Sequence, residues 1–177
     1  MAGGGGEWLA VDVRRGRESC PDRGRSRRFP TPWLIPSNVP KKRARPLFSL
    51  GKYNGLGGKL DPGEDVVACF RREVREESGL ECEELVLRGT ISWPGFGKQG
   101  EDWFGFVFRV DRYRGEPFQE NEEGTLEWIE VEHILDLPLW EGDRFFLPLV
   151  FERAGRAFHG VMPYRDGRPV SWTYSLL

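Results

Sequence analysis

The segment Gly57–Leu80, GGKLDPGEDVVACFRREVREESGL, joins a glycine-rich start to a charged run with helical spacing. We expect a helix over Asp65–Ser78, because acidic residues stand at its start and Gly79 stands where a helix C-cap is needed. The segment before it, with five glycines between Gly51 and Gly63, predicts a loop. The chain is therefore expected to place a glycine-rich loop directly before a charged helix.

The predicted helix has two distinct faces. Residues at positions i, i+3 and i+7 form a narrow apolar stripe that is expected to face the core: Val67, Phe70 and Val74. Beside the stripe, carboxylates at i, i+3 and i+4 share one face: Glu73, Glu76 and Glu77. Taken alone, this periodicity favours an ordinary solvated helix face, because glutamate-rich helices are common.

Three carboxylates on one face favour a nearby cation. Two unit charges 4 Å apart repel by about 4 kcal/mol at an effective dielectric near 20, and exposure to solvent reduces this. Arg72 can offset part of the charge, but one guanidinium cannot serve all three carboxylates at once. Hard oxygen ligands beside a loop that can admit phosphates suit Mg²⁺.

The spacing of the whole segment then distinguishes it from an ordinary surface helix. Gly58, Glu64 and the run Arg72–Leu80 resemble the Nudix box, GX5EX7REUXEEXGU with U aliphatic, at every defined position. The resemblance implies an α/β fold, an α/β/α sandwich with a mixed β-sheet flanked by helices. It also implies Mg²⁺-dependent hydrolysis of a nucleoside diphosphate linked to another group, with Mn²⁺ as a substitute metal.

The resemblance implies roles for single residues of the box. Glu73, Glu76 and Glu77 would hold the metal and include the general base, which is not assigned among them. The Gly58 carbonyl would add a ligand, and Glu64 would pair with Arg72 to brace the loop against the helix. Gly79 is implied to be structural.

The flanks of the box resemble one branch of the family, the human-like 8-oxo-dGTP diphosphatases of the MutT type. The similar stretches are KYNGLGGKLDPGE, PLWEGDRFFLPLV, FHG and SWTYSLL, within residues 52–177. By this resemblance Asn54 and Asp143 would hydrogen-bond the purine edge and Trp140 would stack on the base. Glu123 would lie near the metal. One departure is Gly142, where that branch carries a second aspartate.

Each of these residues also has a simpler interpretation. Asn54 suits an ordinary turn, Trp140 a core position, and Asp143 a helix cap. Lys59, beside the glycines, is expected either to contact phosphate or to be solvated. If Asp143 reads an oxidised base as a donor, its carboxyl must be protonated, which requires burial to raise its pKa.

Charge divides the chain near Pro46. Residues 1–46 carry eleven Lys and Arg against four Asp and Glu, a net +7, and the remainder carries fifteen against twenty-four, a net −9. The first segment is rich in Gly, Pro and Arg and is expected to be irregular, with a nucleic-acid arm or a targeting segment as alternatives. Residues 47–177 are expected to form the hydrolase domain.

Composition indicates a globular chain outside the membrane. Of its 177 residues 38% are hydrophobic, and no apolar run approaches the ~20 residues that span a bilayer. Cys20, Cys69 and Cys82 lack zinc or disulfide spacing, which favours a reducing cytoplasm. His133 and His159 are expected to be structural. The resemblance implies a monomer without nucleic-acid partners.

Further elements are expected after the helix. Three strands are predicted over Leu85–Trp93, Trp103–Val110 and Leu126–Val131, and two short helices over 131–137 and 142–153. The sequence RDGR, residues 165–168, predicts a hairpin turn near the end of the chain.

Together these features favour hydrolysis of oxidised purine nucleoside triphosphates, such as 8-oxo-dGTP, to the monophosphate and pyrophosphate. Such an enzyme cleans the nucleotide pool and prevents DNA damage. Two alternatives stay open. The first is hydrolysis of ADP-ribose, a dinucleoside polyphosphate or an RNA 5′ end, and the second is a non-catalytic module that binds nucleotide.

Overall fold

A four-stranded mixed sheet forms the centre of the computed structural model, which describes residues 32–37, 52–97, 99–118, 125–152 and 155–177. The strand order is β3-β2-β5-β8. β2 is antiparallel to β3 and parallel to β5, and β5 is antiparallel to β8. The strands are β2 (Glu81–Trp93), β3 (Trp103–Arg114), β5 (Phe158–Val161) and β8 (Thr173–Leu176). The predicted mixed α/β sheet is confirmed.

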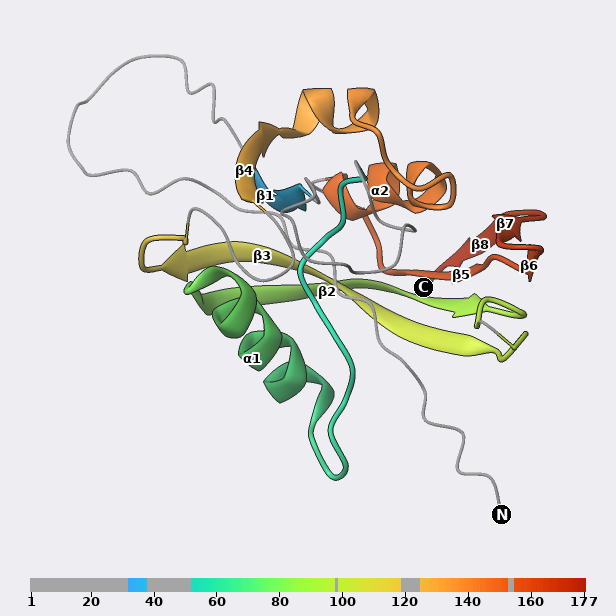
Figure 1. Cartoon of the computed structure of the whole chain (residues 1–177), viewed down its shortest axis with the longest axis horizontal. Coiled ribbons are helices and arrows are strands. Elements are labelled where there is room, and N and C mark those ends of the chain that lie inside the picture. Colours follow the sequence, from blue (N-terminus) through green and yellow to red (C-terminus); the bar gives the residue numbers. More distant parts are fainter. Residues whose placement is uncertain (1–31, 38–51, 98, 119–124, 153–154) are drawn as a thin grey trace, which may run out of the picture.

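Helices cover both faces of this sheet (Figure 1). α1 (Val66–Ser78) lies on one face, and α2 (Asp143–Phe151) lies on the other. The α1 side has a core of Leu56, Phe70, Val74, Leu80, Phe108 and Val110. The α2 side has a larger core of Ile91, Trp93, Val107, Ile134, Leu139, Phe146, Leu147, Val150, Phe158 and Met162.

The ends of α1 follow from local chemistry. The Asp65 carboxylate accepts hydrogen bonds from the backbone N–H groups of Val67 and Ala68, so it caps the first turn. Gly79 has φ of 75°, the left-handed conformation that a helix C-cap requires. The predicted helix therefore agrees with the observed one to within one residue.

The buried face of α1 differs from the predicted stripe at one position. Phe70 and Val74 are buried, but Val67 is 37% exposed, and Val66 packs against the core instead. The buried row repeats every four residues from Val66 through Phe70 and Val74, which turns Val67 outward. The prediction of Val67 as a core anchor is wrong.

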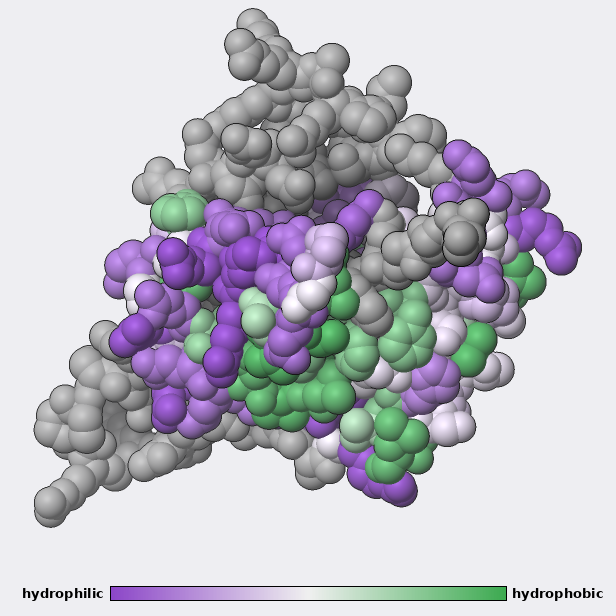
Figure 2. All heavy atoms as spheres, turned by 90° about the horizontal axis from the view of Figure 1, so that it is seen from below, coloured by the Kyte–Doolittle hydropathy of each residue, from purple (hydrophilic) through white to green (hydrophobic). Residues whose placement is uncertain are grey.

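α1 covers only part of its face of the sheet. Phe108 is buried beneath α1, whereas Phe104, four residues earlier on the same face of β3, is 36% exposed. Figure 2 looks onto the molecule from the α1 side and shows hydrophilic side chains beside an apolar surface.

A strand occurs inside the segment predicted to be irregular. β1 (Pro32–Ser37) pairs antiparallel with β4 (Thr125–Glu130) in a two-stranded sheet. Pro32 and Pro36 are four residues apart, so their nitrogen atoms lie along the same edge of β1, a position that an edge strand tolerates. The prediction is wrong for these six residues; the rest of 1–46, and the proposed boundary after Pro46, lie outside the described residues.

The remaining elements lie close to their predicted places. η1 (Val131–Asp136) is a 3₁₀ helix, and β6 (Tyr164–Arg165) and β7 (Arg168–Pro169) form the hairpin. Its turn residues, Asp166 and Gly167, both have positive φ, as Asp-Gly hairpin turns require. None of the described helices has the length and apolar character that crossing a membrane would need.

Candidate active site

The loop before α1 connects two separate groups of polar residues. At one end the Tyr53 N–H donates to the Pro138 carbonyl (3.3 Å), beside the bridge between Tyr53 and Leu139. At the other end the Gly57 N–H donates to Glu77 Oε2 (2.9 Å). Four residue steps separate Tyr53 from Gly57, so the two ends lie within about 14 Å of each other.

Arg72 fastens this loop to α1. Its Nε and Nη2 donate to the two carboxylate oxygens of Glu64 (2.8 and 2.9 Å), and Nη2 also donates to the Lys59 carbonyl (3.2 Å). These hydrogen bonds lower the pKa of Glu64 to about 2 and raise that of Arg72. The expected pairing of Glu64 with Arg72 is present in the structure.

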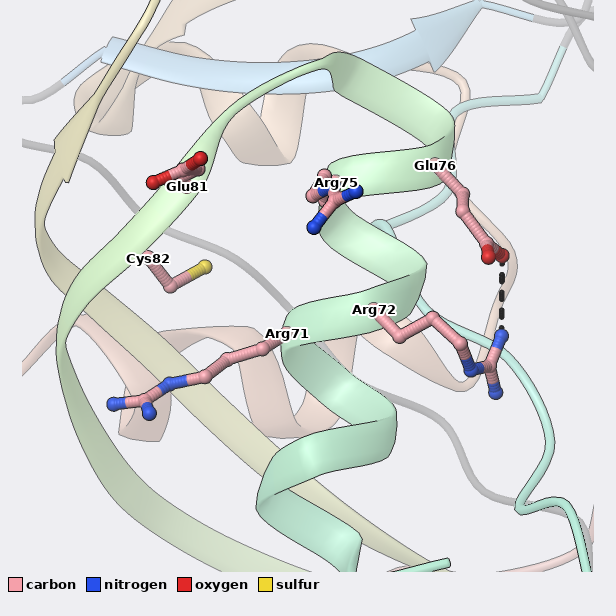
Figure 3. A pocket seen from close by; sticks show the side chains of 6 residues that line it. All are labelled: Arg71, Arg72, Arg75, Glu76, Glu81 and Cys82. Carbon is pink, nitrogen blue, oxygen red and sulfur yellow. Dashed lines mark hydrogen bonds and ion pairs between the residues drawn. The ribbon is translucent and has the colours of Figure 1, made fainter.

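The three glutamates of α1 have different surroundings. Arg72 Nη1 donates to Glu73 Oε1 (2.8 Å) and to Glu76 Oε2 (3.1 Å; Figure 3), while Glu77 is held by the loop. Glu73 is 16% exposed and Glu76 is 60% exposed. A side chain at Gly58 would collide with the Glu73 carboxylate, so this glycine lets the carboxylate approach the loop backbone.

The donor set of these glutamates fits a hard divalent cation. Carboxylate and carbonyl oxygens are the ligands that Mg²⁺ takes in proteins, and the Gly58 backbone lies against Glu73. Across the described part of the chain, no three acidic, histidine or cysteine side chains converge on one point. Arg72 instead neutralises Glu73 and Glu76, so a cation held by these two would replace contacts of the guanidinium. Glu123 lies outside the described residues.

A surface cavity of about 470 Å³ lies beside α1. Its lining consists of Arg71, Arg72, Arg75, Glu76, Glu81 and Cys82. In Figure 3, Arg71 extends toward β2, whereas Arg72 and Glu76 pair on the other side of the helix. The cavity therefore shares Glu76 and its partner Arg72 with the glutamate cluster but includes no residue of the glycine-rich loop.

The other end of the loop adjoins the start of α2. Lys52 Nζ donates to the Leu139 carbonyl (3.0 Å) and lies 6.0 Å from the centre of the Trp140 ring. Trp140 is 37% exposed, so it is not a core residue. Asn54 follows Tyr53, which places it close to this end of the loop. The structure thus brings the predicted base-binding residues to one region.

Asp143 is the first residue of α2 and does not cap it. The N-cap position is Gly142, and the start of the helix has no side-chain cap hydrogen bond. Burial raises the pKa of Asp143 to about 7, and the Lys52 ammonium opposes part of that rise. The carboxyl is therefore substantially protonated near neutral pH, as the donor role requires.

Lys59 and Tyr164 complete the surroundings of the site. Lys59 Nζ lies 5.7 Å from the centre of the Trp103 ring, at the start of β3. Tyr164, which sequence reasoning missed, fills the space that a side chain at Gly142 would need. Lys52 was missed as well. Neither residue carries a local sequence signal, because their places depend on how distant segments pack.

Asp143 makes the stability of the protein depend on pH. The pKa of Asp143 is about 7 in the folded protein, above the unfolded value of 3.8. The contribution of this carboxyl to the free energy of unfolding is therefore present in full below pH 3.8 and is lost as the pH rises to about 7. Relative to Asp143→Asn, the free energy of unfolding of the wild type should fall by up to about 4 kcal/mol between pH 3.8 and about 7. Urea unfolding of both proteins from pH 4 to pH 8 measures this; a difference that stays constant would contradict the burial of the carboxyl.

Comparison with known proteins adds independent information. Residues 25–150 match the NUDIX domain family. An oxidized purine nucleoside triphosphate hydrolase of Danio rerio is 36% identical over 113 residues, covering 64% of this chain and 69% of that protein. The protein of the same name from Mus musculus is 33% identical over 126 residues, covering 71% and 76%. A MutT protein of Bacillus halodurans superimposes with a TM-score of 0.72 over 97% of both chains, at 22% identity, a likeness of fold.

Proposed function

Since the chain belongs to the NUDIX family, we propose that it hydrolyses oxidised purine nucleoside triphosphates, such as 8-oxo-dGTP, to the monophosphate and pyrophosphate. The names of the zebrafish and mouse relatives support this substrate class. The observation that carries the proposal is the loop that joins Asp143 and Trp140 at one end to the glutamates of α1 at the other. One nucleotide can bridge that separation.

The glutamate end supplies the chemistry. Glu73, Glu76 and Glu77, with the Gly58 carbonyl, would hold Mg²⁺, which when bound neutralises phosphate charge and lowers the pKa of a coordinated water. One of these carboxylates accepts the proton of the attacking water. The new bond joins that water oxygen to phosphorus, the α–β phosphoanhydride bond breaks, and pyrophosphate leaves.

The other end of the loop supplies base recognition. The exposed face of Trp140 offers a stacking surface, and stacking of a base on an aromatic ring contributes about 1–3 kcal/mol in nucleic-acid complexes. Asp143 in its protonated form both donates and accepts, and Asn54 adds an amide that does the same. Lys59, whose carbonyl accepts a hydrogen bond from Arg72, would contact the phosphates through its ammonium.

A substrate panel tests the proposal. With Mg²⁺ present, the nucleotide products of 8-oxo-dGTP, dGTP, ADP-ribose, a dinucleoside tetraphosphate and RNA with a 5′ triphosphate are separated and quantified by ion-exchange chromatography. We expect 8-oxo-dGTP to give the highest kcat/KM. Equal turnover of 8-oxo-dGTP and dGTP would contradict selectivity for the oxidised base, and turnover of ADP-ribose or RNA alone would replace the proposed substrate class.

A further inference from the structure

Position 142 has no side chain, and a residue from the C-terminal hairpin occupies the space. A Cβ added to Gly142 would collide with the Tyr164 hydroxyl and would lie 2.7 Å from Met162 Sδ. Tyr164 begins β6, more than twenty residues along the chain, so this contact is tertiary. The Tyr164 hydroxyl is thereby placed beside Asp143, the neighbour of Gly142.

Aromatic contacts fix the ring of Tyr164. The Phe96 ring contacts the Tyr164 ring edge to face, with 4.8 Å between ring centres. Phe96 makes a second edge-to-face contact with Trp103, with 4.7 Å between ring centres. The Tyr164 N–H donates to the Pro94 carbonyl (2.7 Å), so the backbone is held as well. Three aromatic rings therefore form a row from Trp103 through Phe96 to Tyr164. Trp103 lies next to Lys59, and Tyr164 lies next to Asp143. The row connects the phosphate end of the proposed site to the base end.

Two polar groups meet at the base end without partners. Among the residues that the structure describes, neither the Tyr164 hydroxyl nor the Asp143 carboxyl has a hydrogen-bond partner. Burial raises the pKa of Tyr164 to about 12, with Asp143 and Glu141 contributing, so the hydroxyl keeps its proton at neutral pH. Desolvated polar groups that lack partners in the protein are available to a ligand.

We propose that the Tyr164 hydroxyl is a specificity-determining group of this site, and that it hydrogen-bonds the edge of the purine base next to Asp143. This inference rests on the proposed function, since it assigns Tyr164 to the same nucleotide. Because position 142 is glycine, the Tyr164 hydroxyl occupies the space of a residue-142 side chain and places a polar atom there. A phenol both donates and accepts, and it therefore complements Asp143 in either protonation state.

Product binding tests the assignment without requiring turnover. Calorimetry with 8-oxo-dGMP should give a Kd about three- to tenfold higher for Tyr164→Phe than for the wild type, the usual effect of one lost hydrogen bond. Tyr164→Phe keeps the ring against Phe96, so the thermal midpoint should stay close to that of the wild type. Tyr174→Phe is the matched control, because Tyr174 is exposed on β8 and stacks on Trp172, and its Kd should not change.

Kinetics separate this role from a purely structural one. In hydrolysis of 8-oxo-dGTP, Tyr164→Phe should raise KM by the same factor and leave kcat unchanged. An unchanged Kd for Tyr164→Phe, or a wild type that does not bind 8-oxo-dGMP, would overturn the inference. A wild type that binds 8-oxo-dGMP but hydrolyses no triphosphate would refute the proposed reaction, and the comparison of Kd values would still decide the role of Tyr164.

Discussion

Replacing Glu76 with glutamine should lower kcat for 8-oxo-dGTP hydrolysis by about 100-fold or more, with little change in the thermal midpoint. Glu76 is 60% exposed and accepts one hydrogen bond, from Arg72. Glutamine can accept that hydrogen bond too, so the fold loses almost nothing. The charge that would hold the cation or accept the proton of water is lost, and the reaction should slow accordingly.

Two further measurements sharpen this prediction. Glu132→Gln, at an exposed position of η1, is the control and should retain full activity. Raising the Mg²⁺ concentration should recover part of the activity of Glu76→Gln if the carboxylate acts as a ligand, but not if it accepts the proton. Wild-type kcat in Glu76→Gln would remove Glu76 from the catalytic set.

The other two glutamates are less suitable for this test. Glu77 accepts the Gly57 N–H, and Glu73 packs against Gly58, so each also positions the loop. Loss of activity in Glu73→Gln or Glu77→Gln would therefore combine chemistry with loop displacement. Glu76 is the position where the two effects separate best.

Local chemistry explains why α1 could be predicted from the sequence. Asp65 and Gly79 act within one turn of the helix ends, so their effect is visible in a short window of sequence. The start of β2 could not be predicted in the same way. Three of its first four residues are glutamates, and Arg112 and Arg114 of β3 pair with Glu83 and Glu81 across the sheet.

The same distinction between local sequence signals and tertiary packing applies to the residues of the site. The Nudix-box pattern places Glu64, Arg72 and the glutamates on one loop and one helix, and that arrangement is encoded within 23 residues. Tyr164 joins the site only because the C-terminal hairpin packs over the start of α2, which no local pattern encodes. Val66 replaced Val67 in the core for a similar reason, since packing against the sheet sets the rotation of α1.

Arg88 is a further residue whose role depends on packing, and its replacement should have the largest effect on stability. It lies on β2, is 4% exposed, and donates to four backbone carbonyls at the end of α2: Leu149, Val150, Glu152 and Gly155. The last carbonyls of a helix have no partners within it, so the guanidinium satisfies acceptors there, of which Val150 and Glu152 also accept longer hydrogen bonds from Arg109. Its positive charge also suits the negative end of the helix dipole.

Arg88→Met should therefore lower the free energy of unfolding by about 3–5 kcal/mol, because four carbonyls lose a charged donor together. Lysine in Arg88→Lys keeps the positive charge but can reach fewer of these carbonyls, so the free energy of unfolding should fall by an intermediate amount. Arg112→Met is the control, since Arg112 is 60% exposed and pairs with Glu83 and Glu84 at the surface; its loss should stay below about 1 kcal/mol. Urea unfolding measures all three.

The effect of Arg88 should also reach the site, because the helix that it anchors begins at Asp143. If α2 shifts in Arg88→Met, KM for 8-oxo-dGTP should rise while kcat stays closer to the wild-type value, since the glutamates lie on α1 across the sheet. A matched fall in kcat with unchanged KM would mean that Arg88 supports the glutamate end instead. Equal stability of Arg88→Met and the wild type would show that the carbonyls at the end of α2 are satisfied without this guanidinium.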